Sequence, residues 1–535
     1  MLVIWTRSKT DRAVEDARLD GAEMVGAINM INRPDASEVR TAAAELGLTL
    51  DAEASASFLG LMGGLFEAYD LVDQMDNHLP VVKYARSPGV RPSPEGNPFN
   101  AWVVKTQIKG AATGKLAGKT VAIKDNVNVA GVTMENGASI LQGYVPETDA
   151  TIVTRLLDAG AEIHGKAVCE YYCASGGSHT SVSGPVENPI VPGHNAGGSS
   201  SGSAVLVAAG IVDMATGGDQ GGSIRIPAAF CGVVGMKPTH GLVPYTGIFP
   251  VELTVDHAGP ITRTVADNAL MLEVMAGPDG LDPRQSGAPS QAYSEGVQMS
   301  PRGLRIGVVS EGFGQPGAEA AVDNRIREVA DRLGTFGATV EEVSMRLHAA
   351  GAAIWTPIFL EGATELMMRQ NAYGTNMKGV FLESLLDKQS HWKEQANDMS
   401  ETLKLGLLMG HYMSSRHKGR YYGKAQNLNR LLTAAYDDLF RKFDVLLMPT
   451  TPMAAHPLPG PDANRETVVE RAFAMIPNTA PSCATGHPSI SVPAGTTDDG
   501  RPIGAMFIGR KLEETTLYRA AAAVEQLSFA PMTAD

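Results

Sequence analysis

The sequence predicts an α/β protein whose β-sheet carries helices on both faces, preceded by a helical N-terminal segment. Short β-rich runs alternate with helical runs after residue 100, which is typical of such sheets. The chain has 535 residues, 44% of them hydrophobic, so it is long enough to bury a large core. Prolines, which do not fit a helix interior, gather in the stretch 77–100: Pro80, Pro88, Pro92, Pro94 and Pro98. We therefore divide the chain into residues 1–99, a helical segment with a linker, and residues 100–535, the main domain.

The N-terminal segment has the pattern of two helices between residues 37 and 75. Ser37 is expected to cap the first helix and Gly47 to end it, while Asp51 is expected to cap the second. Apolar residues recur in the second helix at spacings of three and four, which places them on one face: Phe58, Leu61, Met62, Leu65, Phe66, Tyr69 and Val72. An apolar face needs a partner, so we expect this segment to support a homodimer.

The main domain follows with alternating elements. Strands are expected at 119–123, 162–166, 304–309 and 443–448, and helices at 151–158, 203–209 and 323–333. Ser203 is expected to cap the second of these helices. Residues 277–302 are rich in Gly, Pro, Ser and Gln and are expected to form a loop.

Charge and hydropathy exclude several classes of partner. The formal net charge is −14 and no concentrated basic run occurs, which argues against nucleic acid or an anionic membrane surface. The apolar run 204–215 is interrupted by Gly210 and Asp213 and is too short to span a bilayer. The apolar start, Met1 to Trp5, precedes its charged residues and lacks a cleavage-site pattern, so we expect no signal peptide. A cytoplasmic protein without a membrane partner is predicted.

Neither the cysteines nor the glycines indicate a metal or a cofactor. Cys169 and Cys173 have no second cysteine pair or close histidine pair beside them, so buried free thiols are expected rather than a zinc site. The run 114–120 has three residues between its glycines, where a phosphate-binding loop needs four.

Two small-residue clusters and a distant lysine carry the chemistry. Residues 197–203 read GGSSSGS, residues 217–227 read GGDQGGSIRIP, and Lys124 follows an apolar run. A serine nucleophile needs a base and backbone N–H groups that bind the oxyanion, and glycine lets the backbone approach a reacting carbonyl. Both clusters adjoin apolar segments, 204–212 and 224–234, which argues against flexible linkers. The pattern favours serine-based acyl transfer.

These clusters, the Lys124 segment and the continuation 228–232 resemble the amidase signature family, and the likeness extends over about residues 100–530, including 242–244, 256–260 and 478–495. The resemblance implies a large mixed β-sheet and a triad in which Ser223 is the nucleophile, Ser199 a cis-serine relay and Lys124 the base. A hydroxyl can accept one proton while donating another, and a lysine accepts a proton only when it is neutral, a form that burial favours. The resemblance also implies an oxyanion hole from the backbone N–H groups around Gln220, Gly221, Gly222 and Ser223, and substrate contacts at Gly176 and Ser200.

The expected function is hydrolysis of a small aliphatic or aryl amide, without metal or cofactor. A carbamate hydrolase with the same triad is the first alternative. An amidotransferase subunit ranks lower because the resemblance would favour glutamine where Ile226 stands, and a catalytically silent binding protein remains open. A Ser-His-Asp triad with a nearby histidine ranks low because no Gly-x-Ser-x-Gly elbow occurs. Asp219 and Arg225 are interpreted as bracing the second cluster. Ser201 and Gln220 depart from the family's usual residues and are expected to affect pocket shape.

Overall fold

A computed structural model describes residues 31–527 and 529. The stretch Met1–Trp5, to which the expectation about a signal peptide refers, lies outside these residues. The chain separates into two compact units, one ending at Pro80 and the other beginning at Val81. The second unit starts with an extended stretch in which Val90 pairs with Lys105 through two backbone hydrogen bonds of 2.8 and 2.9 Å.

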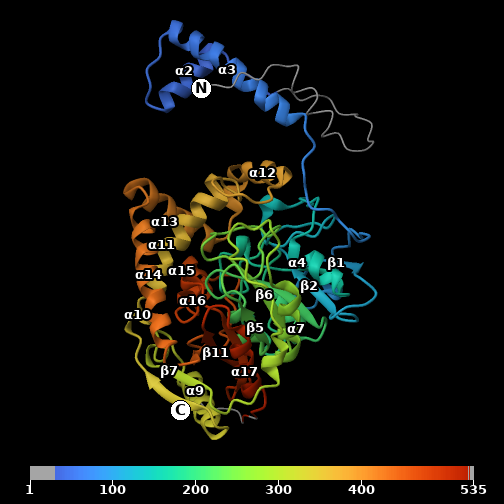
Figure 1. Ribbon diagram of the computed structural model, residues 1–535, viewed down its shortest axis with the longest axis vertical. Coiled ribbons are helices and arrows are strands. Elements are labelled where there is room, and N and C mark those ends of the chain that lie inside the picture. Colours follow the sequence, from blue (N-terminus) through green and yellow to red (C-terminus); the bar gives the residue numbers. More distant parts are fainter. Residues whose placement is uncertain (1–30, 528, 530–535) are drawn as a thin grey trace. The chain divides into compact units, whose positions relative to one another are not determined.

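The first unit contains two helices that pack against each other, α2 (Ala36–Glu45) and α3 (Ala52–Asp73) (Figure 1). The expectation that Ser37 caps α2 is wrong. The Asp35 carboxylate accepts the N–H groups of Ser37 and Glu38, and Glu38 accepts the N–H of Asp35 at 2.8 Å. Asp35, two residues before Ser37, therefore caps the helix and forms a capping box with Glu38. The Ser37 hydroxyl takes no part in this capping box. Asp51 caps α3 by accepting the Ala54 N–H at 2.8 Å, as predicted.

The second unit is built on a mixed sheet of eleven strands in the order β1-β3-β2-β4-β6-β5-β10-β11-β9-β7-β8. The strands are β1 (Trp102–Lys109), β2 (Thr120–Lys124), β3 (Glu162–Ala167), β4 (Met214–Asp219), β5 (Val234–Lys237), β6 (His257–Thr262), β7 (Arg305–Val309), β8 (Thr339–Val343), β9 (Val445–Pro449), β10 (Ser489–Thr496) and β11 (Pro502–Gly509). Strand β2 pairs in parallel with both β3 and β4, and β7 pairs in parallel with both β8 and β9, while the remaining pairs are antiparallel.

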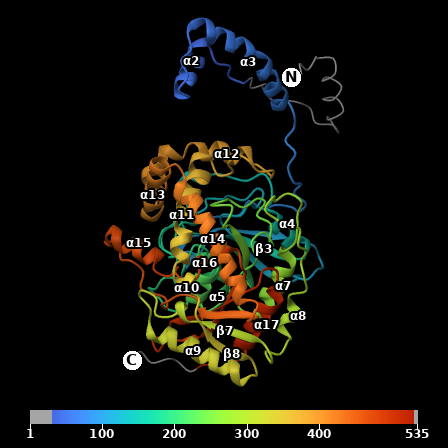
Figure 2. The ribbon, with the colours of Figure 1, turned by 60° about the vertical axis from the view of Figure 1, so that its left-hand side comes forward.

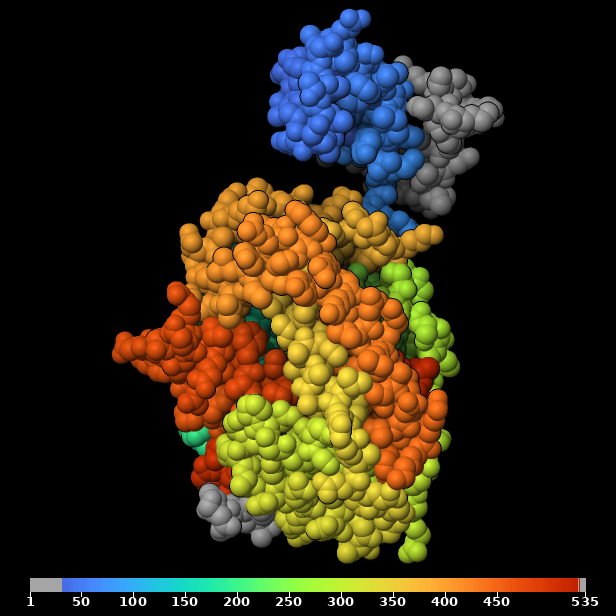
Figure 3. Space-filling model, turned by 90° about the vertical axis from the view of Figure 1, so that its left-hand side faces the viewer, coloured from blue at the N-terminus to red at the C-terminus, as the bar shows by residue number. Residues whose placement is uncertain are grey.

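Helices cover both faces of the sheet, as predicted (Figure 2). The α-helices of this unit are α4 (Thr151–Asp158), α5 (Ser201–Ala208), α6 (Arg225–Cys231), α7 (Val265–Met275), α8 (Ser294–Val297), α9 (Ala320–Thr335), α10 (Arg346–Ala349), α11 (Gly351–Ala363), α12 (Glu383–Ser390), α13 (Glu401–His417), α14 (Arg420–Leu439), α15 (Arg465–Phe473), α16 (Ala480–Thr485) and α17 (Glu514–Glu525). Helices α7, α9 and α17 pack on one face, and α5 and α6 on the other. Helix α11 packs against α13, α14 and α16. The yellow and orange part of the chain, which includes α11, α13 and α14, forms much of the surface seen in Figure 3. In the described part of the chain, no helix combines the length and apolar character needed to cross a membrane.

The predicted elements are present with small differences at their ends. Helix α4 has the predicted bounds, 151–158, and the predicted strands correspond to β2, β3, β7 and β9. Helix α5 begins at Ser201 instead of Ser203 and has no side-chain cap, because the turn before it is held by other contacts of the first cluster. The predicted loop 277–302 includes the single turn of α8.

Strand order places the two small-residue clusters beside the lysine. Strands β2 and β4 are parallel neighbours, β2 ends at Lys124, and β4 ends at Asp219 within the second cluster. The first cluster leads into α5, which packs on β2 and β4. Segments about 75 residues or more apart in the sequence therefore meet at the carboxyl ends of two adjacent strands, where ligands bind in many α/β sheets.

Candidate active site

Lys124 is fully buried at the end of β2. Its backbone N–H donates to Thr216 Oγ1 on β4 at 2.9 Å, which fixes the end of the strand. Its side-chain Nζ donates to Ser199 Oγ at 2.9 Å and to the Gly218 carbonyl oxygen at 3.3 Å. The lysine thus contacts both clusters.

Ser199 is also fully buried and follows a cis peptide bond between Gly198 and Ser199. Its carbonyl oxygen accepts the Glu170 N–H at 3.2 Å. The next residue joins the two clusters, because the Ser200 N–H donates to the Ser223 carbonyl oxygen at 3.3 Å. The Ser200 hydroxyl lies 3.2 Å from both the N and the O of Gly218.

Ser223 occupies the turn between β4 and α6, and 6% of its surface is exposed, whereas Lys124 and Ser199 have none. Gly222 before it has φ 142°, and a Cβ at that position would lie 2.4 Å from Thr479 Oγ1. Only glycine fits this approach, so the turn that presents Ser223 depends on Gly222. Of the three residues, only Ser223 keeps any exposed surface.

The backbone around Ser223 offers N–H groups of two kinds. The Gly222 N–H donates to Asp219 Oδ1 at 2.6 Å, so this predicted oxyanion donor is engaged by a carboxylate. Within residues 31–527 and 529, the N–H groups of Gln220, Gly221 and Ser223 donate to no acceptor. The Gln220 carbonyl oxygen accepts Trp355 Nε1–H at 2.7 Å, and the Gly221 carbonyl oxygen accepts the Thr479 hydroxyl at 2.5 Å. The peptide planes of the turn are therefore held from outside the cluster.

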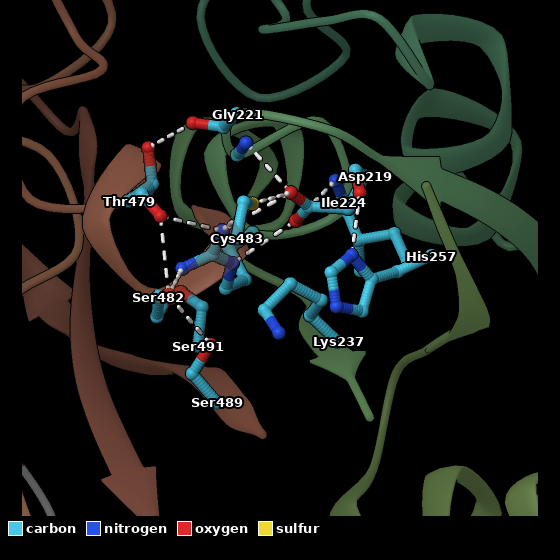
Figure 4. Close-up of polar contacts among 12 residues, drawn as sticks. Asp219, Gly221, Ile224, Lys237, His257, Thr479, Ser482, Cys483, Ser489 and Ser491 are labelled. Atoms are coloured by element: carbon cyan, nitrogen blue, oxygen red, sulfur yellow. Dashed lines mark hydrogen bonds and ion pairs between the residues drawn. The ribbon is translucent and has the colours of Figure 1, made fainter. Parts of the chain in front are cut away.

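A buried ion pair lies beneath this turn (Figure 4). Arg225 donates to both carboxylate oxygens of Asp219 at 3.0 Å, and its remaining N–H groups reach Ser482 Oγ and the Thr479 carbonyl oxygen. Burial alone would raise the pKa of Asp219, but the Arg225 charge and hydrogen bonds outweigh it and lower that pKa to about 2. The carboxylate also accepts the Ile224 N–H at 3.1 Å, which is the geometry of a brace for the turn.

Gly176 and Glu170 lie against the first cluster. The Gly176 carbonyl oxygen accepts the Gly198 N–H at 2.7 Å, and a Cβ on Gly176 would lie 2.8 Å from Met475 Sδ. Glu170 accepts hydrogen bonds from Ser201 Oγ at 2.8 Å and from Thr180, and burial raises its pKa to about 7. Ser201, one of the departures from the family pattern, thus binds a buried carboxyl group.

Histidines are engaged elsewhere. No histidine in the described residues makes a hydrogen bond to Ser223. His257 Nδ1 lies 2.7 Å from the Val255 carbonyl oxygen, and burial moves its pKa well below the ordinary value.

Sequence reasoning missed Thr216, Trp355 and Thr479 as supports of the site. Thr479 falls inside the segment 478–495 that carried the family resemblance, so that segment held a signal for it. Trp355 lies in α11, 135 residues from the Gln220 it binds, and no local pattern points to it.

Comparison with known proteins identifies the family of this chain. A family model described as Amidase matches residues 100–518. The chain is 48% identical over 436 residues to an enantioselective amidase of Rhodococcus rhodochrous, covering 81% of this chain and 84% of that protein. It is 37% identical over 432 residues to a glutamyl-tRNA(Gln) amidotransferase subunit of Haloarcula marismortui, covering 80% and 99%. The solved peptide amidase from Stenotrophomonas maltophilia superposes with a TM-score of 0.63 at 31% identity, covering 77% of this chain and 83% of that one.

The chain belongs to the amidase family, whose members share this mixed sheet. Its greater identity to an amidase than to the amidotransferase subunit favours hydrolysis over amide transfer. It is an amidase, a hydrolase that acts on carbon–nitrogen bonds.

Proposed function

We propose that this amidase cleaves a small aliphatic or aryl amide through an acyl-enzyme on Ser223, with Ser199 and Lys124 as its proton relay. The observation that carries the proposal is the 2.9 Å hydrogen bond between Lys124 Nζ and Ser199 Oγ, formed beside Ser223, which keeps 6% of its surface exposed. A serine hydroxyl is a weak nucleophile until a base takes its proton.

In the first half of the reaction, Ser223 Oγ attacks the amide carbonyl carbon. Its proton passes to Ser199 Oγ, which gives its own proton to the Lys124 amine. The carbonyl oxygen becomes an oxyanion that accepts the N–H groups of Gln220, Gly221 and Ser223, while Gly222 keeps its bond to Asp219. One such donor is worth about 10²–10³ in rate.

In the second half, the carbon–nitrogen bond breaks and the departing nitrogen takes a proton back through the same relay. Ammonia or an amine leaves, and an ester on Ser223 remains. Water attacks this ester with the relay again as base, so the carboxylic acid is released and the Ser223 hydroxyl is restored. We assign Gly176 and Ser200 to the wall of the substrate cavity because both contact the residues that hold the triad.

Labelling with a sulfonyl fluoride tests the nucleophile, and a substrate panel tests the reaction. We expect the reagent to add to Ser223 because that hydroxyl combines exposure with an adjacent relay. Intact mass and peptide mapping should place a single adduct there. Aliphatic amides, anilides and carbamates assayed side by side should give the highest kcat/KM for an amide.

Each alternative predicts a different result from the same two measurements. A preference for carbamates would support the carbamate hydrolase, and labelling without turnover would favour an amidotransferase subunit. The absence of both labelling and turnover would favour a silent binding protein.

We also propose that the N-terminal helices join two copies of the chain. Helix α3 exposes large apolar side chains on one face: Phe58, Leu61, Leu65, Tyr69 and Val72. Exposed apolar patches of this kind mark interaction sites.

The four cysteines are buried and free of disulfides, which fits the proposed cytoplasmic location.

The double substitution Leu61→Lys/Leu65→Lys in the full chain should shift a dimer to a monomer. These side chains are 69% and 54% exposed, so charge there disturbs an interface more than the fold. Light scattering measures the change. Leu408→Lys on α13, at a side chain 70% exposed, is the matched control and should leave the mass unchanged. A dimer that survives the double substitution would contradict this role for α3.

A further inference from the structure

Two of the four cysteines lie together beside the catalytic residues. Cys169 precedes the short turn Tyr171–Cys173, and Cys173 is the last residue of that turn. Both thiols donate to the same atom, Asn136 Oδ1, at 3.4 and 3.5 Å, which brings the two sulfurs together. The other two thiols do not share an acceptor: Cys231 donates to the Ala196 carbonyl oxygen and Cys483 to Asp219 Oδ1.

The backbone holds the pair in place. Tyr172 and Cys173 have φ angles of 46° and 58°, a left-handed conformation that side-chain-bearing residues rarely adopt. The Tyr172 N–H donates to the Asn136 carbonyl oxygen at 3.0 Å, its hydroxyl donates to Gln389 at 2.6 Å, and its ring stacks on Phe249. The proximity of the thiols is therefore fixed by surrounding contacts.

Cys173 also contacts the catalytic centre. The sulfur lies near enough to Lys124 and Ser199 for both residues to lower its pKa, and the residue is 4% exposed whereas Cys169 has no exposed surface. The Cys169 hydrogen bond, followed by the Lys124 charge, lowers the pKa of the Cys173 thiol to about 6 despite burial. Burial raises the pKa of Cys169 well above its ordinary value. Cys173 thus has the greater thiolate character, and the thiolate is the form that peroxides oxidise.

We propose that Cys169 and Cys173 form an oxidisable dithiol next to Lys124, which hydrogen peroxide converts to a disulfide with reversible loss of amidase activity. The Cys173 thiolate attacks one peroxide oxygen, the O–O bond breaks, and hydroxide leaves, giving a sulfenic acid. The Cys169 sulfur then attacks the Cys173 sulfur, an S–S bond forms, and the sulfenic oxygen leaves as water. The two thiols lose two electrons and two protons, and one peroxide becomes two waters.

The effect on activity rests on the proposed relay. A disulfide draws the Cys173 sulfur toward Cys169 and removes a thiol that contacts Lys124 and Ser199. Without the Cys173 thiol beside them, the Lys124 amine and the Ser199 hydroxyl should move from the positions that the relay requires.

The test treats the full-length protein with hydrogen peroxide, assays amide turnover, and alkylates the remaining free thiols before peptide mass spectrometry. We expect most of the activity to disappear and to return with dithiothreitol. The segment containing both cysteines should become two hydrogen atoms lighter and resist alkylation until it is reduced. Cys231→Ser, which removes another buried thiol, should respond as the wild type does.

Two further variants separate the roles of the thiols, each compared with its own untreated activity. Cys173→Ser should keep its activity through the treatment. Cys169→Ser should lose activity that dithiothreitol fails to restore, because a sulfenic acid without a resolving thiol proceeds to the sulfinic acid.

The outcomes also separate this proposal from the proposed function. A wild-type protein that turns over amides but forms no Cys169–Cys173 disulfide overturns the dithiol. A disulfide that forms without any change in turnover overturns the proposed loss of activity. Formation of the disulfide in a protein that lacks amide turnover would contradict the proposed function while the linkage itself stands.

Discussion

If Ser223 is the nucleophile as proposed, replacing it with alanine should abolish amide turnover, with kcat lower by about 10⁴-fold or more, as when the nucleophile is removed from a serine hydrolase. The variant retains the N–H donors and the substrate cavity but has no oxygen on which to form the acyl-enzyme. Its free energy of unfolding should stay close to that of the wild type, because the Ser223 hydroxyl makes no hydrogen bond to the described residues. Steady-state kinetics on the best amide of the panel and urea unfolding measure the two quantities.

Ser203→Ala provides the matched control for this experiment. Ser203 lies in the first cluster and donates to the Thr216 carbonyl oxygen at 2.9 Å, and its hydroxyl has no hydrogen bond to Lys124, Ser199 or Ser223 among the described residues. Its removal should cost about 1 kcal/mol of stability and leave turnover largely intact. Wild-type kcat in Ser223→Ala would exclude this serine as the nucleophile, and an equal loss in both variants would indicate that the cluster fails as a whole.

Local elements of the fold were predictable because their signals are local. The helix 151–158 was predicted with the bounds it has, since its apolar residues follow a helical period and a glycine comes two residues after it. The wrong cap of α2 has an equally local cause: Asp35 and Ser37 are both good cap residues, and the sequence does not decide which one starts the turn. The long-range order of eleven strands depends on pairings that no local window contains.

In the candidate site, too, some residues could be predicted from the sequence and some contacts could not. The clusters and the family resemblance predicted a site of Lys124, Ser199 and Ser223, and the structure places Lys124 in contact with both clusters. The engagement of the Gly222 N–H by Asp219 depends on the turn's own backbone geometry, and the contacts of Trp355 with Gln220 join distant segments. Neither leaves a periodic or compositional trace. Cys173 was expected as a buried free thiol, which it is, but its contact with the lysine arises from two consecutive left-handed residues.

Replacing Arg225 with methionine should destabilise the protein by about 3–5 kcal/mol at pH 7, the usual result of removing one partner of a buried ion pair. Arg225 and Asp219 are both fully buried, so the variant leaves a carboxylate without its cation. The N–H groups of Gly222 and Ile224 donate to that carboxylate, and a shift of Asp219 would also disturb the turn that presents Ser223. Urea unfolding and kcat should therefore both change. Arg305→Met removes the cation of an exposed pair with Asp444 and should have a much smaller effect on stability.

The pH dependence of this loss distinguishes an unpaired charge from a simple packing defect. In the wild type the pKa of Asp219 is about 2, below its ordinary value of 3.8, so the ion pair's contribution to stability is present above pH 4 and is lost as the pH falls toward 2. Without Arg225, burial raises the pKa of Asp219 above its ordinary value, and the folded variant gains stability when the carboxylate takes up a proton. The difference in unfolding free energy between the two proteins should therefore narrow between pH 7 and pH 4. A packing defect alone would keep that difference constant over the same range. The double variant Asp219→Asn/Arg225→Met has no carboxylate to titrate at this position, so its difference from the wild type in unfolding free energy should stay constant between pH 7 and pH 4.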